Sequence, residues 1–132
     1  MKLIDTNIIM YAVGKTHTMK EPCKEVLYNV VKNEISANID IEVLQELLYV
    51  YDSRGDREKG LRIISEMVIL FPNPFVIGKN EIIKAKDLMT KFSTLTTRDA
   101  IHCAVTINLN LEGIISTDKG LDVVKDIYRL NP

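Results

Sequence analysis

The chain has 132 residues, of which 46% are hydrophobic and 27% are charged, and its formal net charge is −1. This length and composition are typical of one soluble globular domain that is large enough to bury a core. The charge balance excludes a general electrostatic attraction to nucleic acid, so any such binding has to come from local patches.

The first half of the chain alternates strands with helices, and the first strand ends abruptly at Asp5. Strands are expected at residues 1–4 and 34–37. Helices are expected at residues 8–13, 19–32 and 40–51. In the last of these helices, apolar residues recur at steps of three and four positions.

The second half continues the same alternation. Helices are expected at residues 56–70, 80–92 and 97–108. Strands are expected at residues 75–77, 113–117 and 127–130. This order predicts a single α/β domain over residues 1–132, with a central, mainly parallel sheet of four to five short strands flanked by helices.

No apolar run reaches the roughly 20 residues of a membrane helix, and no secretory signal is visible, because polar residues from Asp5 onward interrupt the first apolar stretch. Cys23 and Cys103 lie far apart without metal-binding spacing, so we expect two free, mostly buried thiols in a reducing compartment. These features predict a soluble cytoplasmic protein without membrane association.

Two aspartates follow predicted strands: Asp5 follows MKLI, and Asp118 follows GIIST. Ligands of an open parallel sheet bind beyond the carboxyl ends of its strands, so both carboxylates can point into one crevice. Each aspartate can also simply cap the turn or helix that follows, which is the commoner role of such a residue taken alone.

Three further acids are candidates. Glu46 borders the apolar face of its helix, where a carboxylate is partly buried and needs a partner, although an ordinary rim glutamate fits equally well. Asp99 lies in the first turn of its helix, where negative charge also stabilises the positive helix end without any further role. Asp122 is either a peripheral member of the set or a solvated surface residue.

Carboxylates that converge without cations repel one another and raise at least one pKa, and a divalent metal ion removes this conflict. Mg²⁺ or Mn²⁺ is the expected ion, because hard cations prefer carboxylates and water. No histidine or cysteine spacing indicates a zinc site. We expect His102 on the polar side of its helix, as a surface or hydrogen-bonded residue.

Four segments, in this order, resemble the PIN-domain family and in particular its VapC-type toxin ribonucleases. They are LIDTN at 3–7, LQELLYV at 44–50, TRDAIHCAV at 97–105 and IISTDKGLD at 114–122. Each segment is weakly specific alone, but the ordered set covers essentially the whole chain and is a strong signal. The resemblance implies helices around a parallel sheet and an Mg²⁺- or Mn²⁺-dependent endoribonuclease that hydrolyses RNA.

By position, the resemblance implies that four acids are catalytic and hold the metal: Asp5, Glu46, Asp99 and Asp118. Auxiliary positions match Thr6, Asn7, Thr117 and Asp122, and the two threonine hydroxyls are expected to bond metal waters or a phosphate oxygen. Arg98 and Lys119 adjoin two of the acids and are placed to meet a substrate phosphate, while pairing with those acids is equally expected.

The resemblance also implies a small antitoxin partner and a homodimer. Leu48, Tyr49 and Tyr51 could line such an interface, with core packing as the default. A non-catalytic PIN-like scaffold in RNA processing is an alternative. A receiver-like signalling module is disfavoured, because the first strand ends in a single acid and no middle strand ends in aspartate.

Overall fold

The computed structural model describes all 132 residues, and its centre is a parallel sheet of four short strands. The strands are β1 (Lys2–Ile4), β2 (Ala37–Asn38), β3 (Ile114–Ile115) and β4 (Arg129–Leu130). Their order in the sheet is β2-β1-β3-β4, and all three pairings are parallel. The predicted α/β domain with a central parallel sheet is confirmed.

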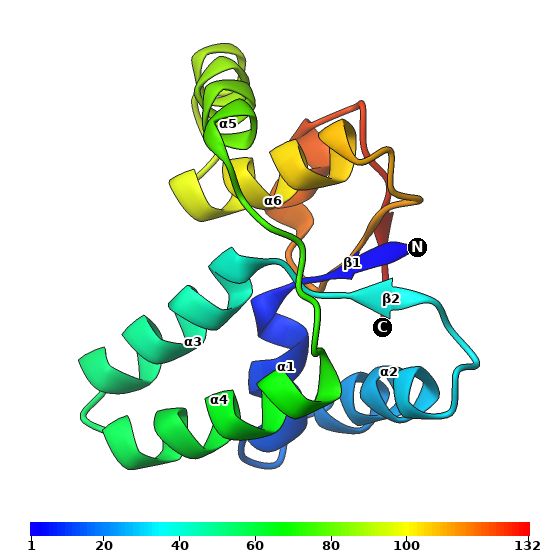
Figure 1. The fold of residues 1–132 in the computed structure, drawn as a ribbon, viewed down its shortest axis with the longest axis vertical. Coiled ribbons are helices and arrows are strands. Elements are labelled where there is room, and N and C mark those ends of the chain that lie inside the picture. Colours follow the sequence, from blue (N-terminus) through cyan, green and yellow to red (C-terminus); the bar gives the residue numbers. More distant parts are fainter.

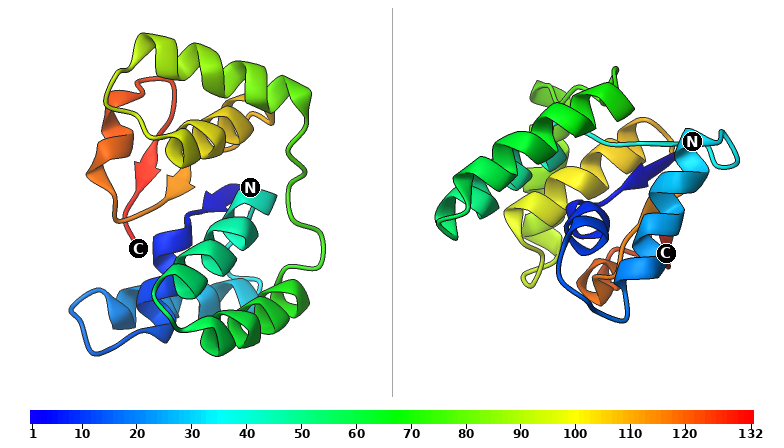
Figure 2. Two further views of the ribbon diagram at one scale, coloured as in Figure 1. Left: turned by 90° about the vertical axis from the view of Figure 1, so that its left-hand side faces the viewer. Right: turned by 90° about the horizontal axis from the view of Figure 1, so that it is seen from below.

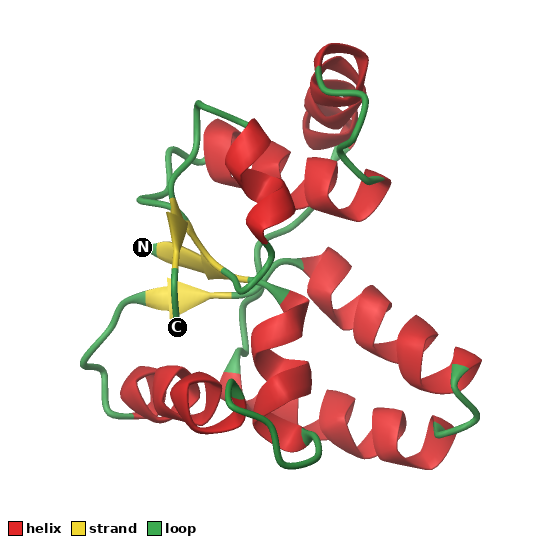
Figure 3. Ribbon diagram, turned by 180° about the vertical axis from the view of Figure 1, so that it is seen from behind, coloured by secondary structure: helices red, strands yellow, loops and turns green.

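Six α-helices surround this sheet and make up most of the molecule (Figure 3). They are α1 (Thr6–Val13), α2 (Lys20–Val31), α3 (Ile41–Ser53), α4 (Arg57–Leu70), α5 (Lys79–Lys91) and α6 (Thr97–Asn108), and a short 3-10 helix, η1 (Lys119–Val123), precedes β4. Helices α1 to α4 lie on one side of the sheet and α5 and α6 on the other (Figure 1). No helix has the combination of length and apolarity that a membrane crossing requires.

The two central strands send alternate residues into two separate cores. Ile4 and Ile115 pack with residues of α1 to α4, whereas Leu3 and Ile114 pack with residues of α5, α6 and η1. This alternation follows from the two-residue period of a strand, and burial on both faces explains why Leu3, Ile4, Ile114 and Ile115 are all apolar. Strand β1 is therefore packed on both faces, which also limits the movement of Asp5 directly after it.

The two predicted free cysteines are also divided between the cores. Cys23 lies in the core formed by α1 to α4, and Cys103 lies in the core formed by α5 and α6. Both are unpaired and buried, which confirms the expectation from their spacing.

Helices α3 and α4 form an antiparallel pair joined by a tight turn (Figure 1). Gly55 has a φ of 74° in this turn, a backbone conformation that glycine adopts without steric cost. A Cβ at Gly60 would lie 2.7 Å from the Cβ of Tyr51, so glycine allows close contact between the two helices. Tyr51 is only 5% exposed and belongs to the core, which is the default that the sequence indicated for it.

Two predicted strands differ from the structure. Residues 75–77 do not form a strand: only Phe75 makes an isolated bridge, to Asp40, in which its N–H bonds to Ile39 and its C=O accepts from Ile41. This segment instead runs along the side of the molecule from α4 to α5 (Figure 2). Strand β2 begins at Ala37 rather than Glu34, because the N–H groups of Glu34 and Ile35 both bond to Asn29 at the end of α2.

Candidate metal centre

Asp5 lies where β1 ends and α1 begins, and it is 4% exposed. Its Oδ1 accepts a hydrogen bond from the backbone N–H of Thr6 at 2.7 Å, which caps α1. Its Oδ2 accepts from Ser116 Oγ at 2.6 Å and from Asn7 Nδ2 at 3.0 Å. Three donors thus hold this carboxylate in one orientation at the carboxyl end of the central strand.

Glu46 reaches the same place from α3, with its side chain 20% exposed. Its Oε2 accepts a hydrogen bond from Thr6 Oγ1 at 2.6 Å. Its Oε1 lies 3.5 Å from Nη1 of Arg98, whose Nε is 3.8 Å from Glu42. The Arg98 guanidinium also lies over the ring of Tyr49, 4.6 Å from its centroid. Arg98, proposed as a phosphate ligand, is therefore paired with acids in this structure.

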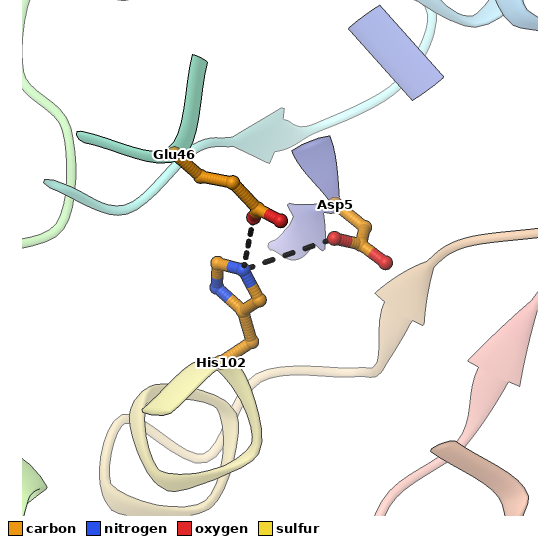
Figure 4. Close-up of side chains that lie close together, drawn as sticks. All are labelled: Asp5, Glu46 and His102. Carbon is orange, nitrogen blue, oxygen red and sulfur yellow. Dashed lines mark ion pairs between the residues drawn. The ribbon is translucent and has the colours of Figure 1, made fainter. Parts of the chain in front are cut away.

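His102 enters the cluster from α6 and has no exposed surface, so its predicted surface position is wrong and its predicted hydrogen bond is present. Its Nδ1 lies 2.7 Å from Oδ2 of Asp40, which is also fully buried. Its Nε2 points between Asp5 and Glu46, 3.8 Å from Oδ1 of the first and 3.7 Å from Oε2 of the second (Figure 4). This nitrogen has no hydrogen-bond partner.

Asp99 and Asp118 lie beside this cluster, but their carboxylates make no hydrogen bond to Asp5, Glu46 or His102. Asp99 is half-buried in the first turn of α6, where its backbone N–H bonds to Thr96 Oγ1 at 3.3 Å. Asp118 is exposed and caps η1 through a 2.8 Å bond from the N–H of Gly120. Its backbone N–H donates to Ser116 Oγ at 2.9 Å, so the hydroxyl that holds Asp5 also holds the start of this loop.

Thr117, Asp122 and Lys119 are three further predicted positions, and each has a different environment. Thr117 contributes its backbone N–H to Asn7 Oδ1 at 3.3 Å, which ties the loop after β3 to the start of α1. Asp122 is exposed and forms an ion pair with Arg129 at 2.8 Å, so the structure does not bring it to the other acids. Lys119 is exposed directly after Asp118 and is free of ion pairs.

The pKa values of the cluster reflect burial and shared charge. Burial raises the pKa of Asp5 in spite of His102 and Ser116. Burial together with the charges of Asp5 and Asp118 raises the pKa of Asp99 to about 6. Burial also acts to raise the pKa of Glu46, but His102 and the Thr6 hydroxyl hold it below its usual value. Collecting these carboxylates therefore costs free energy that a bound cation would relieve.

Burial favours the neutral form of His102, but Asp40 and Glu46 outweigh this effect and raise its pKa well above the ordinary value. The imidazole therefore carries a proton when no other cation is present. One ring nitrogen is bonded to Asp40, and the other is the polar atom that faces the two carboxylates.

The raised pKa of Asp99 predicts that Asp99→Asn stabilises the metal-free protein at neutral pH. A carboxyl whose pKa moves from 3.8 to about 6 on folding favours the folded state fully below pH 3.8, and that contribution is lost as the pH rises through 6. In EDTA at pH 7.5, the variant should gain about 1 kcal/mol of unfolding free energy, after allowance for solvent screening of a half-exposed group. Urea unfolding measures this gain, which should vanish near pH 4; an equal gain at both pH values would contradict the assignment.

The donor set fits a divalent cation. Ligand atoms of Asp5, Glu46 and His102 all lie within 4.8 Å of one another, and Asp99 is close enough to Asp5 for their charges to interact. The unpartnered Nε2 of His102 is a buried polar atom that an ion would satisfy.

Two residues of this arrangement, Asp40 and Ser116, were not singled out from the sequence, and His102 was expected on the polar side of its helix rather than at the metal centre. His102 stands three residues after Asp99, and residues at that spacing share a helix face, so a signal for it was available. Asp40 immediately precedes α3 and caps it through a 3.0 Å bond from the N–H of Val43, which is a common role of aspartate. Nothing in the sequence indicates its second bond, to a ring 62 residues away.

Comparison with known proteins identifies the family of the chain. The PIN domain model matches residues 2–127. The VapC ribonuclease Mb1869c of Mycobacterium bovis and ribonuclease VapC13 of Mycobacterium tuberculosis are each 30% identical to the chain over 130 residues, which are 98% of the chain and 99% of each relative. Ribonuclease VapC7 of Mycobacterium tuberculosis is 26% identical over all of the chain and 92% of that protein.

A solved structure shares the fold. It is the crystal structure of VapBC2 from Rickettsia felis bound to a DNA fragment from their promoter, and the similarity covers 99% of this chain and 98% of the matched chain, with a TM-score of 0.74 and 15% identity. The family profile and the 30% identical relatives confirm the resemblance seen in the four sequence segments. The chain belongs to the PIN-domain family and, within it, to the VapC group.

Proposed function

We propose that this protein is a metal-dependent endoribonuclease and the toxin of a VapBC-type toxin–antitoxin pair. The observation that carries the proposal is the convergence of buried carboxylates from β1 and α3 at one point, with acids of α6 and of the loop after β3 beside them. The similarity to VapC ribonucleases over nearly the whole chain supports the same activity.

Asp5, Glu46, Asp99 and Asp118 would hold Mg²⁺ or Mn²⁺. The bound ion would lower the pKa of a water molecule and neutralise charge that develops on the scissile phosphate. The pKa of about 6 suits Asp99 to accept a proton from the attacking water near neutral pH. Thr6 holds Glu46 in place through its hydroxyl, and Ser116 does the same for Asp5.

The RNA substrate needs positive charge beside this acidic centre. A hollow of about 700 Å³ begins at Asn7, which bonds to Asp5, and its wall carries Lys15, Arg54 and Lys59. These cations, together with Lys119 at the start of η1, are our candidates for binding phosphates of the RNA strand. Arg98 would join them only after it releases Glu46.

We further propose an antitoxin partner and a homodimer, as the similarity to a VapBC structure suggests. Leu48 and Tyr49 on α3 are 41% and 55% exposed, and Leu61 and Ile69 on α4 are 50% and 80% exposed. Apolar side chains that are exposed to this extent are suited to an interface with another chain. The two buried free cysteines agree with action in the cytoplasm, where thiols stay reduced.

Cleavage of labelled single-stranded RNA tests the activity. Wild-type protein with Mg²⁺ or Mn²⁺ should cut the RNA, EDTA should stop the reaction, and an excess of metal should restore it. Asp118→Ala should reduce cleavage by about 100-fold, since several kcal/mol of charge stabilisation depend on the ion that Asp118 would help to hold.

Asp87→Asn is the matched control, because Asp87 is an exposed acid on α5 that pairs only with Lys86. This variant should cleave like the wild type. Full cleavage in EDTA, or by the Asp118→Ala protein, would contradict a metal-dependent nuclease.

A further inference from the structure

We propose that His102 is a direct ligand of the metal ion through Nε2, together with Asp5 and Glu46, and that this nitrogen makes the centre prefer Mn²⁺ to Mg²⁺. The inference rests on the proposed nuclease function and assigns one more residue to the same centre. It starts from a fully buried ring whose Nδ1 is bonded to Asp40, while its Nε2 has no hydrogen-bond partner and makes only ion-pair contacts with Asp5 and Glu46.

The distances exclude a hydrogen-bonding role for Nε2 in this arrangement. It lies 3.8 Å from Asp5 Oδ1 and 3.7 Å from Glu46 Oε2, beyond hydrogen-bond range to either carboxylate. Two atoms that each bind one ion at about 2.1 Å can lie up to about 4.2 Å apart, so both separations are compatible with a shared cation. An ion is thus the partner that this nitrogen lacks.

Asp40 orients the ring of His102 in the way that is typical of a metal-bound histidine. Ligating histidines almost always donate their other ring N–H to a carboxylate or carbonyl, which fixes the ring and leaves the lone pair free for the metal. Asp40 Oδ2 lies 2.7 Å from Nδ1 and takes this role, and its own Oδ1 is held by the N–H of Val43 at the start of α3. Both side chains are fully buried, so the ring cannot turn to another partner.

The nitrogen donor has a consequence for metal selection. Imidazole is a good ligand for first-row transition ions, whereas Mg²⁺ selects oxygen donors. A centre in which one imidazole joins the carboxylates therefore gains more from Mn²⁺ than a centre of carboxylates alone. The ligand form is the neutral ring, which offers the lone pair of Nε2 while Nδ1 stays bonded to Asp40.

Pulsed EPR of the Mn²⁺ complex tests the bond directly, since it detects a nitrogen bound to Mn²⁺. The chain contains only two histidines, so His17→Gln leaves His102 as the only imidazole. His17 is exposed, its Nδ1 accepts a bond from the backbone N–H of Met19, and it is not part of the group of ligand atoms formed by Asp5, Glu46 and His102. The His17→Gln protein should show nitrogen coupling to Mn²⁺, and growth on ¹⁵N-histidine should convert the ¹⁴N pattern to that of ¹⁵N.

This experiment changes nothing at position 102, so it does not depend on a variant of the buried ring. Bound Mn²⁺ without histidine nitrogen coupling would overturn the ligand assignment while leaving the nuclease proposal intact. No binding of Mn²⁺ or Mg²⁺ at all would overturn both.

Metal titration of His102→Gln gives a second readout. Calorimetry should show Mn²⁺ binding weakened about 10-fold or more, because even outer-shell partners of a metal site contribute 10- to 100-fold. Mg²⁺ binding should change much less, so the preference for Mn²⁺ should fall. An equal loss for both ions, in a protein that folds like the wild type, would indicate a purely structural histidine and contradict the proposal.

Discussion

Asp5→Asn should reduce metal-dependent RNA cleavage by about 100- to 1000-fold while the fold remains intact. The metal stabilises transition-state charge by several kcal/mol, and each 1.36 kcal/mol corresponds to a tenfold change in rate. Asp5 is the acid most firmly held in the cluster, with three hydrogen bonds at the carboxyl end of β1. An amide keeps the shape of the side chain but removes the charge that holds a cation.

Single-turnover cleavage and metal calorimetry should be measured on the same preparation of this variant. We expect weaker metal binding and slower cleavage together, with thermal unfolding close to that of the wild type, because removal of a buried charge with a raised pKa offsets the less favourable bond to Asn7. Asp87→Asn again serves as the matched exposed control. If Asp5→Asn cleaves RNA at the wild-type rate, Asp5 has no part in catalysis.

The second large effect concerns stability. Asp40→Ala should lower the unfolding free energy by about 3 to 5 kcal/mol in EDTA, because it leaves the ring of His102 buried without its partner and removes the cap of α3. For a chain of this length, such a loss lowers the melting temperature by about 10 °C or more.

Asp40→Ser separates the two contributions, since a serine hydroxyl can replace the cap but cannot reach the imidazole. The serine variant should recover only about 1 kcal/mol of the loss seen with alanine. Calorimetric unfolding of both proteins in EDTA measures this difference. Full recovery by serine would mean that the bond between Asp40 and His102 contributes nothing to the fold.

The sequence predicts the helices well because each has a clear apolar period and a clear start or stop. Residues 97–108, for example, are helical with the predicted limits, after the cap at Thr96. Short strands are harder to place from pattern alone, since β2 and β3 have only two residues each and depend on pairing across the sheet. The predicted strand at 75–77 failed for this reason: its only ladder contact is the bridge from Phe75 to Asp40.

The four acids were found from the sequence because two follow strands and the segment order matched a family. Apolar periodicity placed His102 on a polar side of α6 that does not exist, because the middle of this helix is buried all round, from Ala100 to Thr106, and only its spacing of three residues from Asp99 indicated the site. A helix without an exposed face offers no polar side on which to place a histidine. Its partner Asp40 comes from a distant helix start, and such a contact is set by the packing of α3 against α6 rather than by local sequence.

The acids at helix starts have an electrostatic consequence. Asp5 precedes α1, Asp99 lies in the first turn of α6, and Asp118 precedes η1. The peptide dipoles of a helix place partial positive charge at its N-terminus, which stabilises a neighbouring anion by about 0.3–1 kcal/mol. The backbone thus offsets part of the mutual repulsion of the carboxylates before any cation binds, and it does so in the elements that also position them.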